Sequence, residues 1–328
     1  MRSLRKLVAR YGVHALRTLL LCTLLLGVTS AQPPVEDGGW DFVDEEEETA
    51  PSLLALASEQ ALDIGLFVAF AALAMVSFLR KSVPLKYVTL VVSVLYMGVY
   101  KSQLISVVNI FGTITGNLPV FSYSLAWYAF AIFTVVTTVL WGRLYCGRIC
   151  AFGALTQLID AVVPKRFQLE VPANVERYAG YVKYAILFAA VGYYLATSEI
   201  AFYRYIEPFW LFTFDATPVL WVMVGALLVA SIFVRNLYCR FLCPLGAALG
   251  LVSSVTTVFK IKRWSECSQC ALCERTCEWG AIRKRKIIKA ECVRCDDCEI
   301  LYDDKQRCPH WLLELKRKAY AAAGDNTA

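Results

Sequence analysis

Cysteines are concentrated at the end of this chain: eight of the thirteen lie within its last 62 residues. They form two strings, Cys267, Cys270, Cys273 and Cys277, then Cys292, Cys295, Cys298 and Cys308. In each string, three cysteines are separated by two-residue gaps and a fourth lies farther along. Three thiolates spaced in this way can fold around three corners of one iron–sulfur cube, but so short a loop cannot supply the fourth ligand without strain. The strings therefore predict a small module that holds two 4Fe-4S clusters.

The outlying cysteine of each string is expected to serve the other string, as in two-cluster ferredoxins. This assigns one cluster to Cys267, Cys270, Cys273 and Cys308, and the other to Cys292, Cys295, Cys298 and Cys277. Structural zinc is one alternative. Zinc sites, however, bring pairs of cysteines together in a tetrahedron, so the third cysteine of each triplet would not be used as a ligand. Disulfides are the other alternative, and the topology below argues against them.

The rest of the chain is unusually apolar, with 58% hydrophobic residues and a mean hydropathy of +0.52. Such a composition is typical of chains that are largely buried in lipid. Five stretches are each about long enough to cross a bilayer, near residues 61–79, 87–111, 123–141, 180–197 and 218–235. We therefore predict a mostly α membrane protein with a five-helix transmembrane bundle over 61–258. A small α+β double-cluster ferredoxin-like module follows over 259–318, and a flexible tail over 319–328.

The first residues have the pattern of a signal peptide. A basic segment, an apolar run at Thr18–Val28 and the small residues Thr29–Ala31 follow one another. We expect a signal peptide over 1–31, or alternatively an uncleaved anchor, and then an acidic periplasmic segment over 32–60. Cleavage would leave His310 as the one remaining histidine, which argues against a haem-b quinol dehydrogenase with a histidine pair in the membrane.

Charged residues predict how the chain is oriented. Lys and Arg are frequent in the loops at 80–86 and 143–165 and from 235 onward, whereas 36–48 is acidic. By the positive-inside rule, the ferredoxin-like module lies in the cytoplasm of a bacterium and the helices in its inner membrane. This reducing compartment disfavours disulfides. The net charge of +6 is explained by anionic lipid headgroups and cluster charge, so lipid is an expected partner and nucleic acid is not.

An internal repeat lies within the apolar part. Residues 143–154 read RLYCGRICAFGA and residues 236–247 read NLYCRFLCPLGA. Two helical hairpins related by parallel duplication would bring their cysteine pairs together at the cytoplasmic boundary. Cysteines four apart share one helical face, so Cys146, Cys150, Cys239 and Cys243 are candidates for an additional metal or iron–sulfur centre. The alternative is that they are small packing residues beside tight turns.

Polar residues interrupt the second apolar stretch: Lys101, Gln103, Ser106 and Asn109. Polar groups within lipid usually face the bundle or a water-filled path. Contact with a quinone or a proton is one reading. The other reading is hydrogen bonding between helices, with Lys101 reaching outward.

In combination, these motifs resemble a known family. Two membrane Cys-x-x-x-Cys elements followed by a cytoplasmic double-cluster ferredoxin are similar to the polyferredoxin membrane proteins that include NapH, FixG/RdxA and NosR/NirI. The second string, CVRCDDCEILYDDKQRCPH, has nine residues before its last cysteine and resembles the NosR/NirI kind most. The resemblance covers about residues 61–318. It implies electron transfer in anaerobic respiration, nitrous oxide reduction especially.

The chain also departs from this family. NosR-like proteins carry a large extracytoplasmic flavin-binding domain between the signal and the helices, and here 32–60 occupies that place. The resemblance therefore implies the C-terminal transmembrane and 4Fe-4S part without the N-terminal flavin domain, together with a separate partner that carries flavin or haem. Ala151 and Glu278 replace prolines of the family pattern. Because proline supplies no ligand, ligation is expected to persist.

The expected function is electron relay between the cytoplasmic side and a membrane or periplasmic acceptor. The chain would be the electron-carrier component of a redox complex rather than a stand-alone enzyme, so no catalytic residue is assigned. Two alternatives stay open. One is a FixG-like assembly factor that reduces copper at the membrane cysteines, and the other is a redox-sensing regulator.

Overall fold

The computed structural model describes residues 58, 60–102, 104–115, 125–169, 171–198, 203, 207–213, 217–256, 258, 261, 270, 272–283, 286–315 and 317. The segments expected over 1–31 and 319–328 lie outside this part, as do most of 32–60 and Cys267.

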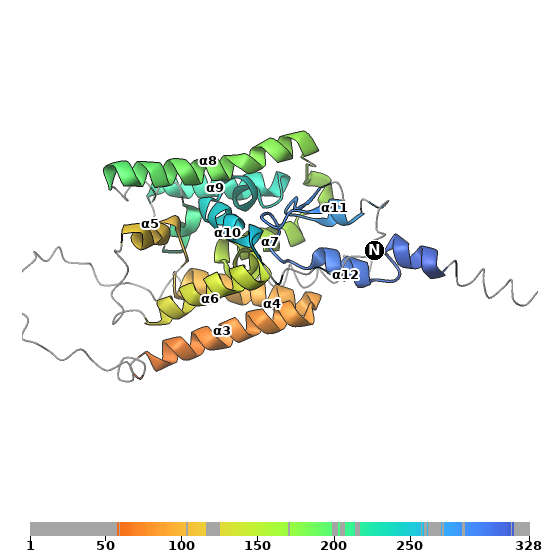
Figure 1. Cartoon of the computed structure of the whole chain (residues 1–328), viewed down its shortest axis with the longest axis horizontal. Helices are drawn as coiled ribbons and strands as arrows, with labels where there is room; N and C mark the ends of the chain where they lie inside the picture. The colour runs from red at the N-terminus through yellow and green to blue at the C-terminus, as the bar shows by residue number, and fades with distance from the viewer. Residues whose placement is uncertain are drawn as a thin grey trace, which may run out of the picture.

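Apolar helices form a bundle whose longer members run roughly along the molecule (Figure 1). The longer helices are α3 (Ala61–Arg80), α4 (Val83–Ser93) continued by the π-helix η1 (Val94–Tyr100), α6 (Leu125–Trp141), α8 (Ala173–Thr197) and α9 (Pro218–Phe233). The shorter ones are α5 (Val107–Thr115), α7 (Ala151–Val162) and α10 (Pro244–Ser254), with 3-10 turns η4 (Lys165–Phe167) and η6 (Pro208–Thr213). Large aromatic and aliphatic side chains from most of these helices form one buried core.

Three helical segments are long and apolar enough to cross a membrane: Ala61–Arg80, Val83–Tyr100 and Asn174–Thr197. The apolar helices α6 and α9 coincide with two further predicted spans but are shorter. A mostly helical membrane fold is thus supported. The prediction of five spanning helices stays a prediction.

The second apolar stretch, expected as one helix over 87–111, is broken, and this expectation is wrong. The helix ends at Tyr100, Ser102 adopts a left-handed conformation with φ 49°, and α5 begins at Val107. A helix that starts inside an apolar bundle exposes unpaired N–H groups, which need acceptors. Glu207 supplies them, because its carboxylate accepts hydrogen bonds from the Val107 N–H at 2.8 Å and from the Ser106 hydroxyl.

The polar residues of this stretch thus belong to the break and its surroundings. Lys101 pairs with Asp63 of α3 at 2.7 Å, and Asn109 Oδ1 accepts a hydrogen bond from the Ser106 N–H at 3.3 Å. Gln103 lies outside the described residues. Of the two readings, bonding between elements of the bundle accounts for Lys101 and Ser106.

The two repeats have the same backbone. A π-turn, η3 (Tyr145–Ile149) or η7 (Tyr238–Leu242), is followed by one extended cysteine, Cys150 or Cys243, and then by α7 or α10. In both copies the N–H of that cysteine donates to the carbonyl of the repeat's tyrosine, at 2.9 and 2.8 Å. The two cysteines of each pair therefore flank a break between helices. The expectation that they share one continuous helical face is wrong.

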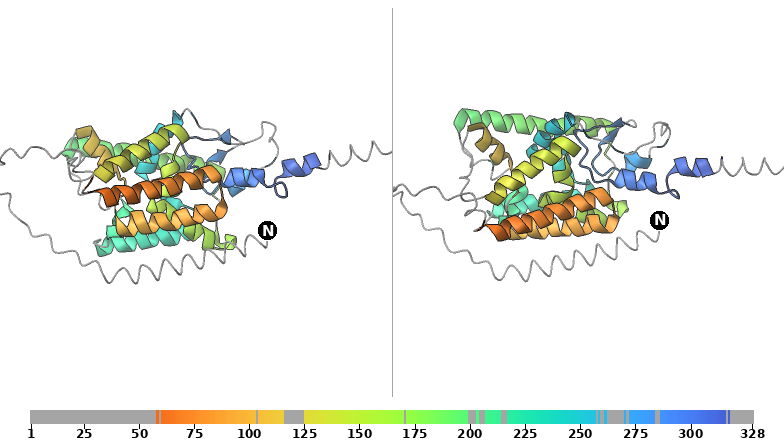
Figure 2. Two further views of the ribbon diagram at one scale, coloured as in Figure 1. Left: turned by 90° about the horizontal axis from the view of Figure 1, so that it is seen from below. Right: turned by 60° about the horizontal axis from the view of Figure 1, so that its bottom comes forward.

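A small α+β module follows the bundle and lies at the end opposite α5 (Figures 1 and 2). It contains α11 (Leu272–Thr276), the antiparallel strands β1 (Ile282–Arg283) and β2 (Lys286–Ile287), and α12 (Asp297–Asp303), with further helix over 309–315. The module places the second cysteine string beside the first repeat turn, where Val293 meets Gly147.

Candidate functional site

Four cysteines from both strings line one cavity in the module. They are Cys277, Cys292, Cys295 and Cys298. Cys277 directly follows α11 and its N–H donates to the Cys273 carbonyl at 3.1 Å, while Cys298 lies in the first turn of α12. This is the set that the exchange of outlying cysteines predicts for one cluster. Its binding of a cluster stays a prediction.

The chemistry of this cavity fits an iron–sulfur cluster. Apolar side chains such as Ile282, Ile287 and Val293 form much of its lining, together with the four sulfurs. The indole N–H of Trp279, in the same lining, is buried and has no hydrogen-bond partner among the described residues. Buried donors are rarely left unpaired, and cluster sulfurs accept hydrogen bonds that tune the reduction potential. The Trp279 N–H is therefore available for such a bond.

Burial affects the ionisation of these thiols. It raises the pKa of Cys277, and it raises the pKa of Cys292 to about 11. Cys298 is shifted in the same direction, again by burial first and then by neighbouring thiols. Metal ligation needs thiolates, so occupation of the cavity by a cluster would release protons.

The other predicted set is described only in part. Cys273 and Cys308 are buried and Cys270 is partly exposed, whereas Cys267 lies outside the described residues. Cys273 belongs to α11, which packs against α12, and Cys308 follows the end of α12. The assignment of these four cysteines to a second cluster stays a prediction.

In the described part of the chain, no three histidine, cysteine, aspartate or glutamate side chains are placed to hold one metal ion. A tetrahedral zinc with bonds near 2.3 Å would bring its sulfurs to within about 3.8 Å of one another. A cube of four irons spreads its cysteines farther apart. The described cysteines therefore do not form the compact group that one tetrahedral ion requires.

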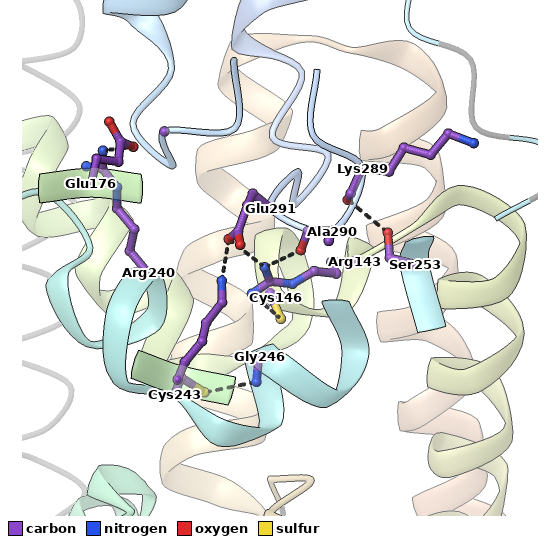
Figure 3. A network of polar contacts seen from close by, with 12 residues as sticks. Arg143, Cys146, Glu176, Arg240, Cys243, Gly246, Ser253, Lys289, Ala290 and Glu291 are labelled. Atoms are coloured by element: carbon purple, nitrogen blue, oxygen red, sulfur yellow. Dashed lines mark hydrogen bonds and ion pairs between the residues drawn. The ribbon is translucent and has the colours of Figure 1, made fainter. Parts of the chain in front are cut away.

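The membrane cysteines Cys146, Cys150, Cys239 and Cys243 are all buried. The Gly246 N–H donates to Cys243 Sγ at 3.2 Å. Arg143 Nη2 lies 3.9 Å from Cys146 Sγ and donates to it (Figure 3). The sulfurs of Cys146 and Cys243 thus each have a hydrogen-bond donor, and a positive charge lies beside Cys146, which small packing residues do not require.

Arg143 also connects these cysteines to the second string (Figure 3). Its Nη1 donates to the Ala290 carbonyl at 2.9 Å and lies 3.7 Å from the Glu291 carboxylate. Glu291 pairs in addition with Lys183 of α8. One buried guanidinium therefore contacts both a membrane sulfur and the residues immediately before Cys292.

The first repeat lies against the second string at Gly147. A Cβ atom added to Gly147 would overlap the Val293 carbonyl oxygen, so only glycine permits this contact. Gly147 follows Cys146, and Val293 follows Cys292. The backbones that carry a membrane cysteine and a module cysteine are therefore in direct contact.

Ion pairs surround this contact. Arg148 Nη2 lies 2.8 Å from Asp296 Oδ2, and both side chains are 1% exposed. Lys86 pairs with Asp297 at 2.8 Å, and Lys81 pairs with Glu299. From the sequence, the basic loops served only to orient the chain, and these partners were missed. The sequence does contain an indication of these ion pairs, because the basic loops and the acidic second string have complementary charge.

Two family models match the chain. One, described as a 4Fe-4S binding domain, matches residues 123–170 and 216–263. The other, NosR, matches residues 265–319. The 4Fe-4S model thus falls on the two repeats and includes Cys146 with Cys150 and Cys239 with Cys243, the residues assigned only to an additional centre. The NosR model covers both cysteine strings.

Curated relatives agree with these models. The chain is 34% identical over 248 residues to "Regulatory protein NosR" of Pseudomonas aeruginosa, which covers 71% of the chain and 35% of that protein. It is 30% identical over 295 residues to "Regulatory protein NosR" of Stutzerimonas stutzeri, covering 83% and 41%. "Protein NirI" of Paracoccus denitrificans is 32% identical over 200 residues, covering 56% and 28%. The chain spans less than half the length of each of these relatives. No solved structure matches it.

Proposed function

Because this chain belongs to the NosR/NirI-like polyferredoxin family, we propose that it is a membrane-bound electron-transfer protein of denitrification-type respiration. It would hold two 4Fe-4S clusters in the module over 259–318, one on each predicted set of cysteines. A further redox centre would use the four membrane cysteines. A bound cluster supplies one-electron chemistry, taking up and releasing a single electron at its irons.

The observation that carries this proposal is the contact between the two groups of cysteines. The cavity lined by Cys277, Cys292, Cys295 and Cys298 adjoins the first repeat through Val293 and Gly147. Arg143 contacts Cys146 and the residues before Cys292. The protein's part in electron transfer is to hold the thiolates, to exclude water with apolar side chains, and to fix the distance between the two groups.

The distribution of basic residues supports one orientation of the chain in the membrane. The basic residues that contact the second string lie at the end of the bundle where the module sits, so by the positive-inside rule this end would face the bacterial cytoplasm. Roughly 30 Å of hydrocarbon then separates the module from an acceptor on the outer side. The proposal therefore includes a separate redox partner, carrying flavin or haem, within or beyond the membrane.

The test uses the full chain purified in lipid nanodiscs. Iron analysis should give about eight irons for the module clusters, and more if the membrane cysteines also bind iron. Cys146→Ser and Cys239→Ser should each remove the same additional paramagnetic signal and leave the module clusters intact. Ala151→Ser, a buried change beside the first pair, serves as the packing control. Fewer than about six irons per chain would reject the two-cluster proposal.

A second candidate function is redox-sensing regulation, favoured by the name of two relatives, "Regulatory protein NosR". The two functions separate in cells of the source organism. Electron relay predicts that the membrane-cysteine variants lose respiratory electron flow. Sensing predicts that they alter reductase gene expression while electron flow through existing reductase continues.

A further inference from the structure

A groove of about 620 Å³ opens where the bundle meets the module. One wall comes from the first turns of α8, a second from the segment that joins α9 to η7, and a third from α11 and the two strands. Its volume is within the range of ordinary small-molecule sites. The groove is separate from the cavity that holds the four cysteines, although Cys277 lines both.

Positive charge dominates the lining. Six cationic side chains contribute: Arg177, Arg235, Arg240, Arg275, Arg283 and Lys286. Two carboxylates oppose them, Glu176 and Glu274. The lining therefore carries an excess of four positive charges in a space the size of one small ligand.

Among the described residues, four of these six cations have no carboxylate partner. Glu176 is already engaged, because it pairs with Arg240 and lies 3.9 Å from Arg283. Within the part of the chain that the structure describes, no carboxylate lies within 4 Å of the cationic groups of Arg177, Arg235, Arg275 or Lys286. Arg235 instead donates to the Arg275 main-chain carbonyl at 3.4 Å, which brings the two arginines together. Like charges gathered in this way repel one another unless an anion joins them.

We propose that this groove binds a phosphate-bearing ligand. Guanidinium groups match phosphate oxygens in paired, charge-assisted hydrogen bonds, and a cluster of arginines is the usual protein counterpart of phosphate. The neighbouring Tyr181 ring and the side chains of Ile282 and Ile288 give the ligand an apolar surface beside the charged one. The ligand is either a soluble nucleotide or the headgroup of an anionic lipid, since the groove lies where the helices meet the module.

The inference does not depend on the proposed electron transfer, because it concerns binding alone. The test uses the full chain in nanodiscs of phosphatidylcholine, with flavin mononucleotide and inorganic pyrophosphate as soluble probes in equilibrium dialysis. A parallel preparation contains phosphatidylglycerol, and native mass spectrometry counts the lipid molecules retained.

The diagnostic variant is Arg235→Gln with Arg275→Gln, which removes two positive charges from the groove. The matched control is Arg80→Gln with Arg166→Gln, two exposed cations outside the groove that, like the first two, have no carboxylate within 4 Å among the described residues. The groove variant should weaken probe binding, or lower the occupancy of retained phosphatidylglycerol, at least about tenfold, and the control less than about twofold. Lys286→Gln, an exposed change, replaces the double variant if that variant loses iron or aggregates.

Each outcome is informative. Groove-dependent binding of a soluble probe identifies a soluble phosphate ligand, and tighter binding of flavin mononucleotide than of pyrophosphate identifies it as a nucleotide. Groove-dependent retention of phosphatidylglycerol identifies a lipid headgroup. Equal behaviour of the groove and control variants in both arms would overturn the proposal.

Discussion

The buried pair of Arg148 and Asp296 should hold the module on the bundle, and Asp296→Asn tests this. Asp296 has a left-handed conformation with φ 63°, which asparagine also tolerates, so the change removes charge with little backbone strain. Arg148 keeps its hydrogen bond to Ser77 Oγ at 2.6 Å but loses the carboxylate at 2.8 Å. Because both partners are 1% exposed, the lost charge is not replaced by water.

Removal of one partner of a buried pair costs about 3–5 kcal/mol. The amide of asparagine can still accept one hydrogen bond, so the lower end of this range applies, about 3 kcal/mol. At 1.4 kcal/mol per factor of ten, the population of undocked module should rise roughly 100-fold. Hydrogen exchange over residues 286–303 in nanodiscs, with iron content measured in parallel, reports this opening.

Asp304→Asn is the control, because Asp304 pairs with Arg307 at 3.2 Å on the surface and both side chains are about one-third exposed. Such a pair contributes about 1 kcal/mol or less. In the Asp296→Asn background, Arg148→Met should add far less opening than it does alone, since the two residues act as a unit. Equal exchange in the Asp296→Asn and Asp304→Asn variants would refute the reasoning.

Three further outcomes are expected. Gly147→Ala should destabilise docking of the module by about 1–3 kcal/mol, because the added Cβ overlaps a main-chain carbonyl, and the module should be proteolysed faster. Gly192→Ala, which has open space around it, should have no such effect. Cys277→Ala should remove the cluster of the second string and Cys308→Ala that of the first, and loss of the same paramagnetic signal from both variants would contradict the exchange of ligands. Glu207→Ala should lower the free energy of unfolding by about 2–3 kcal/mol, because two donors at the helix break lose their acceptor. An unchanged midpoint in thermal denaturation would count against the role of Glu207 as that acceptor.

The sequence was most informative where the chemistry is local. Cysteine spacing is a property of a short segment, so the set of Cys277, Cys292, Cys295 and Cys298 could be proposed before the cavity was seen. The duplicated Leu-Tyr-Cys motif likewise indicated two equivalent elements, although not the break between helices that each contains. Hydropathy indicated apolar stretches that coincide with helices such as α3, α6 and α9, because apolar composition is also a local property.

Features that join distant segments could not be predicted in this way. The break near Ser102 depends on Glu207, about 100 residues later, and a hydropathy window does not register a single carboxylate that caps another helix. The partners of Lys81 and Lys86 lie more than 200 residues away. A basic loop looks the same in sequence whether it faces lipid headgroups or an acidic surface of its own chain.

These long-range ion pairs bear on the order in which the protein matures. In the proposed orientation, Lys81, Lys86 and Arg148 are the charges that keep their loops on the cytoplasmic side during insertion. Their carboxylate partners, at 296–299, are synthesised later than all of the helices of the bundle. These three positive charges therefore have no carboxylate partner while the helices are inserted into the membrane. They form their ion pairs only after the module docks. A rearranged chain in which the module is synthesised first would cover these charges early, and its helices would insert with mixed topology.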